Sequence, residues 1–406
     1  MNYWYHRNEI MVLPDDLIAF AWSAPMRDLA AKVGLSDVGL KKLLKGFGVV
    51  TPPQGHWNRV HAGRKVPAPP RAPHRRPGES GRLMVDSRFS SFIAQALPIS
   101  ADGPFETPEV PGDLGALRER ELKALGRVTV PRTLESHHPG LNDITGKEER
   151  RRQKAATSSW HWDAPRFDNP VDQRRLKLFN GILLALAKRG HSGDASATDT
   201  EISARARIGS TWLGLSLEIA GKHRTIVSHG YRRPDPALPV GTPLILRVKP
   251  GFDREIGDTW QDEDGNRLES RIAEITAALI VAGEAKFRQR LREDEERAEQ
   301  ERIEREREAE EARRERERRR LERTRELNEQ RVTDLRTSGE LLRAARDLRT
   351  LIAEVREAMR DRVVVDAETL EAWASWALRE ADALDPILSG QVLKHLHPPQ
   401  LPPPED

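Results

Sequence analysis

The sequence predicts a multidomain, mainly α-helical protein that contains one small central α+β domain. Three patterns along the 406 residues support this fold class: short apolar helices near the N-terminus, a helix followed by strands in the centre, and a long charged helical stretch after them. Charged residues make up 32% of the chain and apolar residues 37%, so part of it is expected to be extended or covered by solvent. A chain of this length has room for two or three domains.

Residues 26–45 are expected to form two short helices joined by a tight turn. Gly34 lies between them, where a residue without a Cβ readily adopts the positive φ angle that such a turn needs. Ser36 is expected to cap the second helix, because its side-chain oxygen can accept a hydrogen bond from a free backbone amide. The expected core of the pair consists of Leu29, Ala30, Val33, Leu40 and Leu43. This spacing resembles the helix-turn-helix of bacterial repressors and recombinases.

The second of these helices is the candidate DNA-binding element. Its outward positions are Ser36, Asp37, Val38, Lys41, Lys42 and Lys45. In a helix that enters the major groove, hydroxyl and carboxylate oxygens accept hydrogen bonds from base amino groups, while lysines hold phosphates. Residues 1–78 carry twelve Lys and Arg against five Asp and Glu, which suits a phosphate-facing module. The alternative is a small helical domain whose exposed face only confers solubility.

Residues 1–62 are expected to form one three-helix domain. Its first helix starts at Pro14, Ser23 caps the second helix, and Trp57 folds back as a lid on a proline-bounded flap. Residues 63–115 are expected to be an extended basic linker, because they are rich in Pro and Gly. The basic residues of this arm are Arg64, Lys65, Arg71, Arg75 and Arg76. They can follow the DNA backbone or enter a minor groove, and a plain solvated linker is the alternative.

Residues 116–283 are expected to form the α+β domain. The apolar spacing over residues 172–188 predicts an amphipathic helix, and residues 190–194 are expected to be a loop. Strands are expected at residues 201–208, 211–219, 223–228 and 243–249. After a turn at residues 262–266, a last helix begins near Leu268 and packs on the sheet.

Residues 284–336 are expected to form a charged helical rod, with seventeen acidic and seventeen basic residues between Glu284 and Arg331. Acid-first pairs at i,i+4 spacing support a helix: Glu293/Arg297, Glu301/Arg305, Glu310/Arg314 and Glu315/Arg319. The apolar residues keep no heptad, so a solvated single helix is favoured over a coiled coil, which stays the alternative. Residues 337–391 are expected to form a C-terminal helical domain, with helices at residues 341–359 and 367–384 and with Trp373 and Trp376 in its core. The Pro-rich tail, residues 392–406, is expected to be disordered.

Several chemistries are not expected. The chain has no cysteine, so it can form no disulfide and no zinc–thiolate site. Its histidines, among them His137, His138, His161 and His229, do not have metal-ligand spacing. A nuclease-like set of Asp264, Glu284 and Lys286 is interpreted as coincidence, because its Glu-x-Lys lies in a helix. No metal, no cofactor and no enzymatic activity are expected. The absence of a signal sequence and of a long apolar run predicts a cytoplasmic, nucleoid-associated protein with no membrane contact.

Four stretches carry a second resemblance: Trp22-Ser-x-Pro-Met-x-x-Leu-Ala30, Gly34-Leu-Ser-Asp-Val-Gly-Leu40, Pro52-Pro-Gln-Gly-His-Trp57 and Trp373-Ala-Ser-Trp-Ala-Leu-Arg-Glu-Ala-Asp-Ala-Leu-Asp-Pro386. They resemble a bacterial protein family with an N-terminal helix-turn-helix, although His56 stands where a Tyr is expected. The resemblance implies that motif and no particular activity.

Together these observations predict a non-enzymatic protein that binds double-stranded DNA. The charged helix and the C-terminal helices are expected to bind a protein partner or a second copy of the chain. As a transcriptional regulator the protein dimerises and reads an inverted repeat. As an architectural or defence-complex subunit it tethers a partner to DNA. A third possibility is a DNA-associated enzyme with an unrecognised central active site.

Overall fold

The computed structural model describes residues 9–157, 164–198, 201–228, 231–249, 258–360 and 365–398. The chain forms two compact units, Met1–Arg297 and Ala298–Asp406. The first unit contains two separate apolar cores, one formed by residues 12–93 and one by residues 125–280. None of the helices in the described ranges is long and apolar enough to cross a membrane.

The N-terminal core is built from four helices and a two-stranded sheet. The helices are α1 (Pro14–Ala21), α2 (Met26–Lys32), α3 (Asp37–Gly46) and α4 (His56–His61). Strand β1 (Glu9–Val12) pairs antiparallel with β2 (Leu83–Asp86). Three predictions are confirmed: α1 starts at Pro14, Gly34 has φ +66°, and the Ser36 side chain caps α3.

Other local predictions in this region are wrong. Ser23 does not cap α2, because its hydroxyl donates to the Phe20 carbonyl at 2.8 Å and thus belongs to the end of α1. Leu43 packs against the core as predicted but is only partly buried, and the prediction missed Leu44, which is fully buried because it lies one turn after Leu40 on the same face of α3. On the flap, the ring of His56 rather than that of Trp57 is buried.

The stretch 63–115 is not simply a linker. Its strand β2 completes the sheet with β1, and the short 3-10 turn η2 (Ser87–Phe89) follows directly. Phe89 and Ile93 are buried in the N-terminal core, where the Phe89 ring packs edge-on against Phe20 with 5.4 Å between ring centroids. An extended Pro- and Gly-rich chain can therefore supply core residues when another part of the protein pairs with it.

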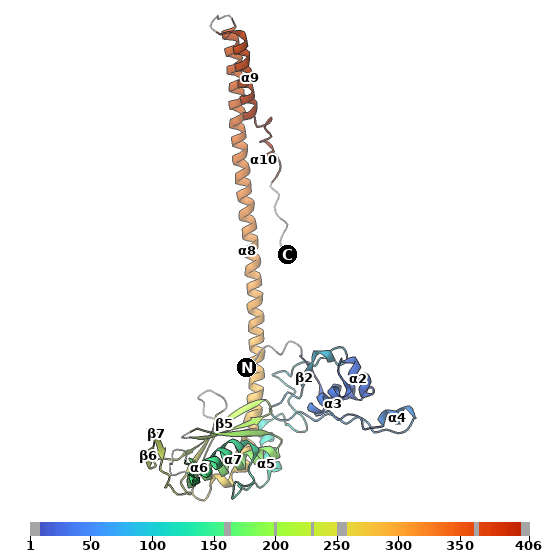
Figure 1. Ribbon diagram of the computed structural model, residues 1–406, viewed down its shortest axis with the longest axis vertical. Helices are drawn as coiled ribbons and strands as arrows, with labels where there is room; N and C mark the ends of the chain where they lie inside the picture. The colour runs from blue at the N-terminus through green and yellow to red at the C-terminus, as the bar shows by residue number, and fades with distance from the viewer. Residues whose placement is uncertain are drawn as a thin grey trace. The chain divides into compact units, whose positions relative to one another are not determined.

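The central core lies between helices and one face of a sheet. The sheet is antiparallel, with the order β3 (Ser192–Ala197), β4 (Ile202–Ile208), β5 (Thr211–Ile219), β8 (Leu244–Lys249) and β9 (Thr259–Gln261). A separate hairpin consists of β6 (Thr225–Ser228) and β7 (Tyr231–Pro234). The helical elements are α5 (Leu114–Leu125), η3 (Pro139–Leu141), α6 (Asn142–Thr157), α7 (Pro170–Lys188) and η4 (Leu268–Ser270). In Figure 1, α5, α6 and α7 lie together on one side of β5.

The predicted helix and strands of this domain are confirmed within a few residues, but β3 was expected to be a loop. The sequence of β3 lacks apolar alternation, and β3 lies at the edge of the sheet. Gly193 is needed there, because a Cβ at this position would lie 2.5 Å from both the Arg205 carbonyl and the Leu183 side chain. This close approach is a tertiary feature, so local propensity does not reveal it.

The predicted rod and the predicted helix at residues 341–359 are parts of one helix, α8 (Ile272–Met359). Two of the four expected acid-first pairs form ion pairs, Glu310–Arg314 and Glu315–Arg319. In the other two, Arg297 pairs with Asp294 and Arg305 donates to a backbone carbonyl.

The C-terminal unit also contains α9 (Ala367–Leu384) and α10 (Leu393–Leu396). Asp366 caps α9 as predicted. The prediction that Trp376 belongs to the core is wrong, because its side chain is 52% exposed, while Ala374 and Ala381 form the buried face of α9. The prediction that the tail from residue 392 is disordered is wrong for residues 393–396, which form α10, while residues 399–406, together with His161 and His229, lie outside the described residues.

Candidate nucleic-acid interface

Helix α3 is held by one apolar face and leaves the opposite face exposed. Leu40 and Leu44 are fully buried against Leu29 and the rest of the N-terminal core. The turn before α3 is closed by a hydrogen bond of 2.9 Å from the Leu35 amide to the Ala30 carbonyl. No atom lies within 4 Å of a Cβ built at Gly34, so glycine is required there by its backbone angle and not by crowding.

All six predicted contact residues of α3 and its cap are exposed, and Val38 is 71% exposed. Three of them are the lysines Lys41, Lys42 and Lys45. Within the described residues, none of these lysines has an ion-pair partner. Helical spacing places Lys42 and Lys45 on the side away from Leu40 and Leu44, and Lys41 on the flank of the buried face. The exposed face of α3 therefore presents three uncompensated positive charges, which attract an anionic partner.

The two residues at the front of α3 already make local hydrogen bonds. The Ser36 Oγ accepts from the Gly39 amide at 3.0 Å, and the Asp37 Oδ1 accepts from the Val38 amide at 2.9 Å. Both bonds satisfy amides of the first helical turn, which have no partner inside the helix. Ser36 keeps its hydroxyl hydrogen for donation, so it can contact a phosphate or a base acceptor without losing its role as cap.

Further basic residues surround α3. Arg64 and Lys65 follow α4 and are exposed, as predicted. The sequence interpretation missed Arg27 and Lys32 on α2, which are also exposed and have no ion-pair partner in the described part of the chain. Arg27 lies in the first turn of α2, a position from which the first helix of a helix-turn-helix can contact the DNA backbone. In the sequence, the positive charge of Arg27 and its place at the start of the predicted helix could have identified it as a candidate contact residue.

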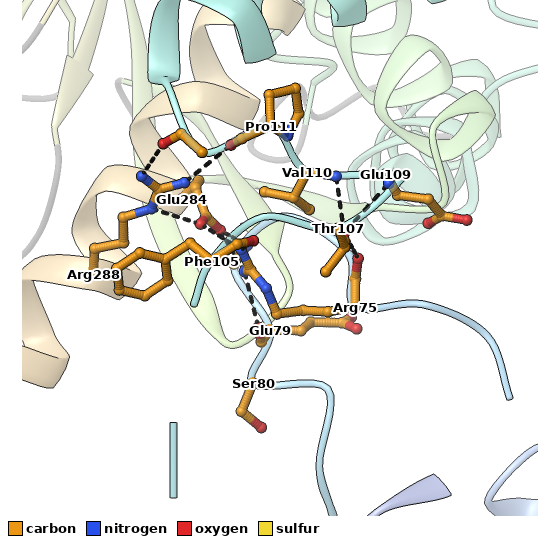
Figure 2. Close-up of polar contacts among 12 residues, drawn as sticks. Arg75, Glu79, Ser80, Phe105, Thr107, Glu109, Val110, Pro111, Glu284 and Arg288 are labelled. Atoms are coloured by element: carbon orange, nitrogen blue, oxygen red, sulfur yellow. Dashed lines mark hydrogen bonds and ion pairs between the residues drawn. The ribbon is translucent and has the colours of Figure 1, made fainter. Parts of the chain in front are cut away.

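Arg75 was counted in the exposed basic arm, and this prediction is wrong. Its side chain is 5% exposed and forms an ion pair with Glu284 of α8, whose side chain is fully buried. Both guanidinium nitrogens Nη1 and Nη2 donate to the Glu284 carboxylate at 3.0 Å (Figure 2). A buried guanidinium paired in this way cannot follow a DNA backbone.

Glu284 has no free acceptor site for chemistry. Besides Arg75, its carboxylate accepts from the Gly78 amide at 2.7 Å and from the Arg288 Nε at 2.8 Å. The Arg288 guanidinium continues the network to the carbonyls of Pro111 and Gly112 (Figure 2). This cluster attaches residues 75–112 to α8. Glu284, which the sequence placed in a nuclease-like set with Asp264 and Lys286, is therefore a structural anchor.

A cavity of about 510 Å³ in the central domain offers no catalytic pair. Its charged lining residues are Arg132, Arg174, Lys177, Arg267 and Glu269. The Glu269 carboxylate is engaged by Arg174 at 2.7 Å. Among the described residues, no group of three or more His, Asp or Glu side chains is arranged to hold a metal ion.

Comparison with known proteins does not add a functional assignment. No family model matches the chain, and no curated protein or solved structure matches it significantly. The resemblance to helix-turn-helix proteins thus rests on the residues of α2 and α3 alone.

Proposed function

We propose that this protein is a non-enzymatic DNA-binding protein in which α2 and α3 act as a helix-turn-helix and α3 enters the major groove. The observation that carries the proposal is the exposed face of α3, with Lys41, Lys42 and Lys45 free of ion-pair partners in the described part of the chain. Lysines in such an arrangement bind phosphates and release their counterions, which is the main source of affinity for duplex DNA.

The dimensions of α3 support this role. Its ten residues span about 15 Å at about 1.5 Å per residue. The major groove is about 12 Å wide and admits one α-helix. In this proposal Ser36, Asp37 and Val38 face base edges at the front of α3, and Arg27, Arg64 and Lys65 contact the backbone beside it.

The C-terminal unit is proposed to bind a protein partner or a second copy of the chain. Eight large apolar residues in the described part of this unit are at least half exposed: Leu321, Leu335, Leu351, Trp376, Ile387, Leu388, Leu393 and Leu396. Exposed large apolar side chains can mark a binding surface. With a second copy the protein would act as a dimeric regulator, and with another partner it would act as a DNA-tethering adaptor.

The proposal is tested by selecting duplexes from a random library with the full chain and measuring their affinity by fluorescence anisotropy. The expected result is an enriched duplex to which Lys42→Glu abolishes detectable binding, because the new carboxylate repels phosphate. Lys222→Glu is the matched control, since Lys222 is exposed on the loop between β5 and β6. Absence of any binding, or equal binding by both variants, would reject α3 as the DNA-binding helix.

A further inference from the structure

The central sheet has two chemically different faces. Its inner face is apolar and packs against α7 and α8, because every second residue along β4, β5 and β8 is buried in the central core. The register places the intervening residues on the outer face. In order across the strands, these are Ser192, Asp194, Ser196, Ser203, Arg205, Arg207, Trp212, Gly214, Ser216, Glu218, Ile245, Arg247, Lys249, Thr259 and Gln261.

Trp212 lies on this outer face and is 42% exposed. Arg207 is its direct cross-strand neighbour, and its guanidinium carbon lies 5.6 Å from the centre of the indole ring. The guanidinium carbon of Arg205 lies 5.2 Å from the same centre. Gly214 follows two residues later on the same face and adds no side chain. Both guanidinium groups thus lie over the partly exposed indole ring, and Lys249 lies next to Gly214, with its Cβ 3.5 Å from a Cβ built on the glycine.

The surroundings of Trp212 carry more positive charge than their ion pairs neutralise. Arg205 pairs with Asp194, and Arg247 pairs with Glu218. Four other cations on or beside the outer face have no ion-pair partner within the described residues: Arg207, Lys249, Lys286 and Arg290.

Two of these four cations come from α8 and lie next to the turn between β4 and β5. The Lys286 Nζ lies 3.5 Å from the Trp212 carbonyl, and the Arg290 Nη2 donates to the Ser210 hydroxyl at 2.6 Å. They therefore border the side of Trp212 where β4 ends and β5 begins.

We propose that this face binds single-stranded nucleic acid, with a base stacked on Trp212 and its phosphates held by Arg207, Lys249, Lys286 and Arg290. The aromatic ring favours a single strand over a duplex, because base faces are accessible only when bases are unpaired. The basic border supplies the phosphate contacts that such a strand needs. This surface is distinct from α3 and goes beyond the proposed duplex binding, so either proposal can fail without the other.

The test measures the binding of the full chain to fluorescent 20-nucleotide oligothymidylate and oligouridylate by anisotropy. Trp212→Ala is expected to weaken binding about tenfold, within the range that loss of one stacked base produces. Trp212→Phe is expected to restore most of the affinity, because it keeps a ring. Comparing the two oligonucleotides distinguishes DNA from RNA as the strand.

Phe92→Ala is the matched control, because the Phe92 ring is as exposed as Trp212, at 42%, and lies outside the central sheet. It is expected to leave the affinity unchanged. Lys42→Glu is likewise expected to leave binding to the single strand intact while it abolishes duplex binding. Circular dichroism verifies that Trp212→Ala remains folded. The proposal is overturned if neither oligonucleotide binds, or if folded Trp212→Ala binds as tightly as Phe92→Ala.

Discussion

Arg75 and Lys42 are both basic residues of the N-terminal region, yet their surroundings give them opposite roles. Arg75 is buried against Glu284, whereas Lys42 is exposed and has no ion-pair partner in the described part of the chain. Removing Glu284 would leave a buried cation without compensation, a change that generally costs more than the loss of an exposed charge. At this scale, burial and pairing distinguish Arg75, a structural anchor, from Lys42, whose charge is available to a partner.

The α3 residues could be predicted from sequence, because a helix-turn-helix is local: Gly34, Ser36 and the lysines lie within twelve residues of one another. Arg75 and Glu284 are 209 positions apart, and no local pattern brings them together. The same reason explains why the interpretation missed Trp212 and Lys286, which become neighbours only through the fold.

His191 makes the stability of the first unit dependent on pH. It is 8% exposed, and desolvation lowers its pKa to about 4, against a smaller opposing effect of the nearby Glu121 carboxylate. In the unfolded chain the imidazole has its ordinary pKa of about 6.5. Between pH 6.5 and 4 the unfolded state therefore binds a proton that the folded state does not. Above pH 6.5 the titration of His191 does not reduce the free energy of unfolding. On acidification the free energy of unfolding falls below this value, by about 2 kcal/mol at pH 5.

Urea unfolding at pH 7 and pH 5 measures this effect. His191→Gln is expected to remove most of the difference between the two pH values, because the titrating group is gone. His74→Gln is the control, since His74 is exposed. An unchanged pH dependence in His191→Gln would show that the acid sensitivity arises elsewhere.

At the scale of elements, the sequence interpretation succeeded where one pattern determined the structure. Strand β5 has the predicted bounds and α7 begins two residues before the predicted helix, because alternation and helical spacing are strong in these segments. Helix α6 was not predicted, since only Ile144 and Glu148 of its sixteen residues are buried. It is held by polar contacts, such as the one from the Arg166 amide to Glu148 at 2.7 Å.

Helix α8 continues through Gly339, where the sequence suggested a boundary. Glycine in a helix interior costs up to about 1 kcal/mol relative to alanine. No atom lies within 4 Å of a Cβ built at Gly339, so the new methyl group has space. Gly339→Ala is therefore expected to raise the stability of the C-terminal unit by about 0.5–1 kcal/mol, which thermal unfolding followed by circular dichroism can measure.

The same helix offers a substitution of opposite sign. A Cβ at Gly283 would lie 2.4 Å from the Cβ of Ile208, where α8 crosses the sheet. Gly283→Ala is expected to destabilise the first unit, because overpacking there outweighs the gain in helix propensity. If both substitutions changed stability in the same direction, packing would not be what distinguishes the two parts of α8.

At the scale of the whole molecule, the contacts within the first compact unit determine which form of the protein can be used in binding experiments. The N-terminal core needs β2, Phe89 and Ile93, and residues 75–112 are anchored on α8 by Glu284 and Arg288. A fragment that ends at residue 78 would lose part of that core. DNA binding is therefore tested with the full chain.

The central claim is that the lysines of α3 contact DNA phosphates, and the salt dependence of duplex affinity tests it most directly. Each phosphate-bound lysine contributes about 0.9 to the slope of log K against log salt concentration. We expect the triple variant Lys41→Ala, Lys42→Ala and Lys45→Ala to lower the magnitude of this slope by about 2 to 3. The matched triple variant Lys123→Ala, Lys222→Ala and Lys394→Ala, at three exposed positions elsewhere, should leave it unchanged. Equal slopes for the wild-type protein and the α3 variant would contradict the account.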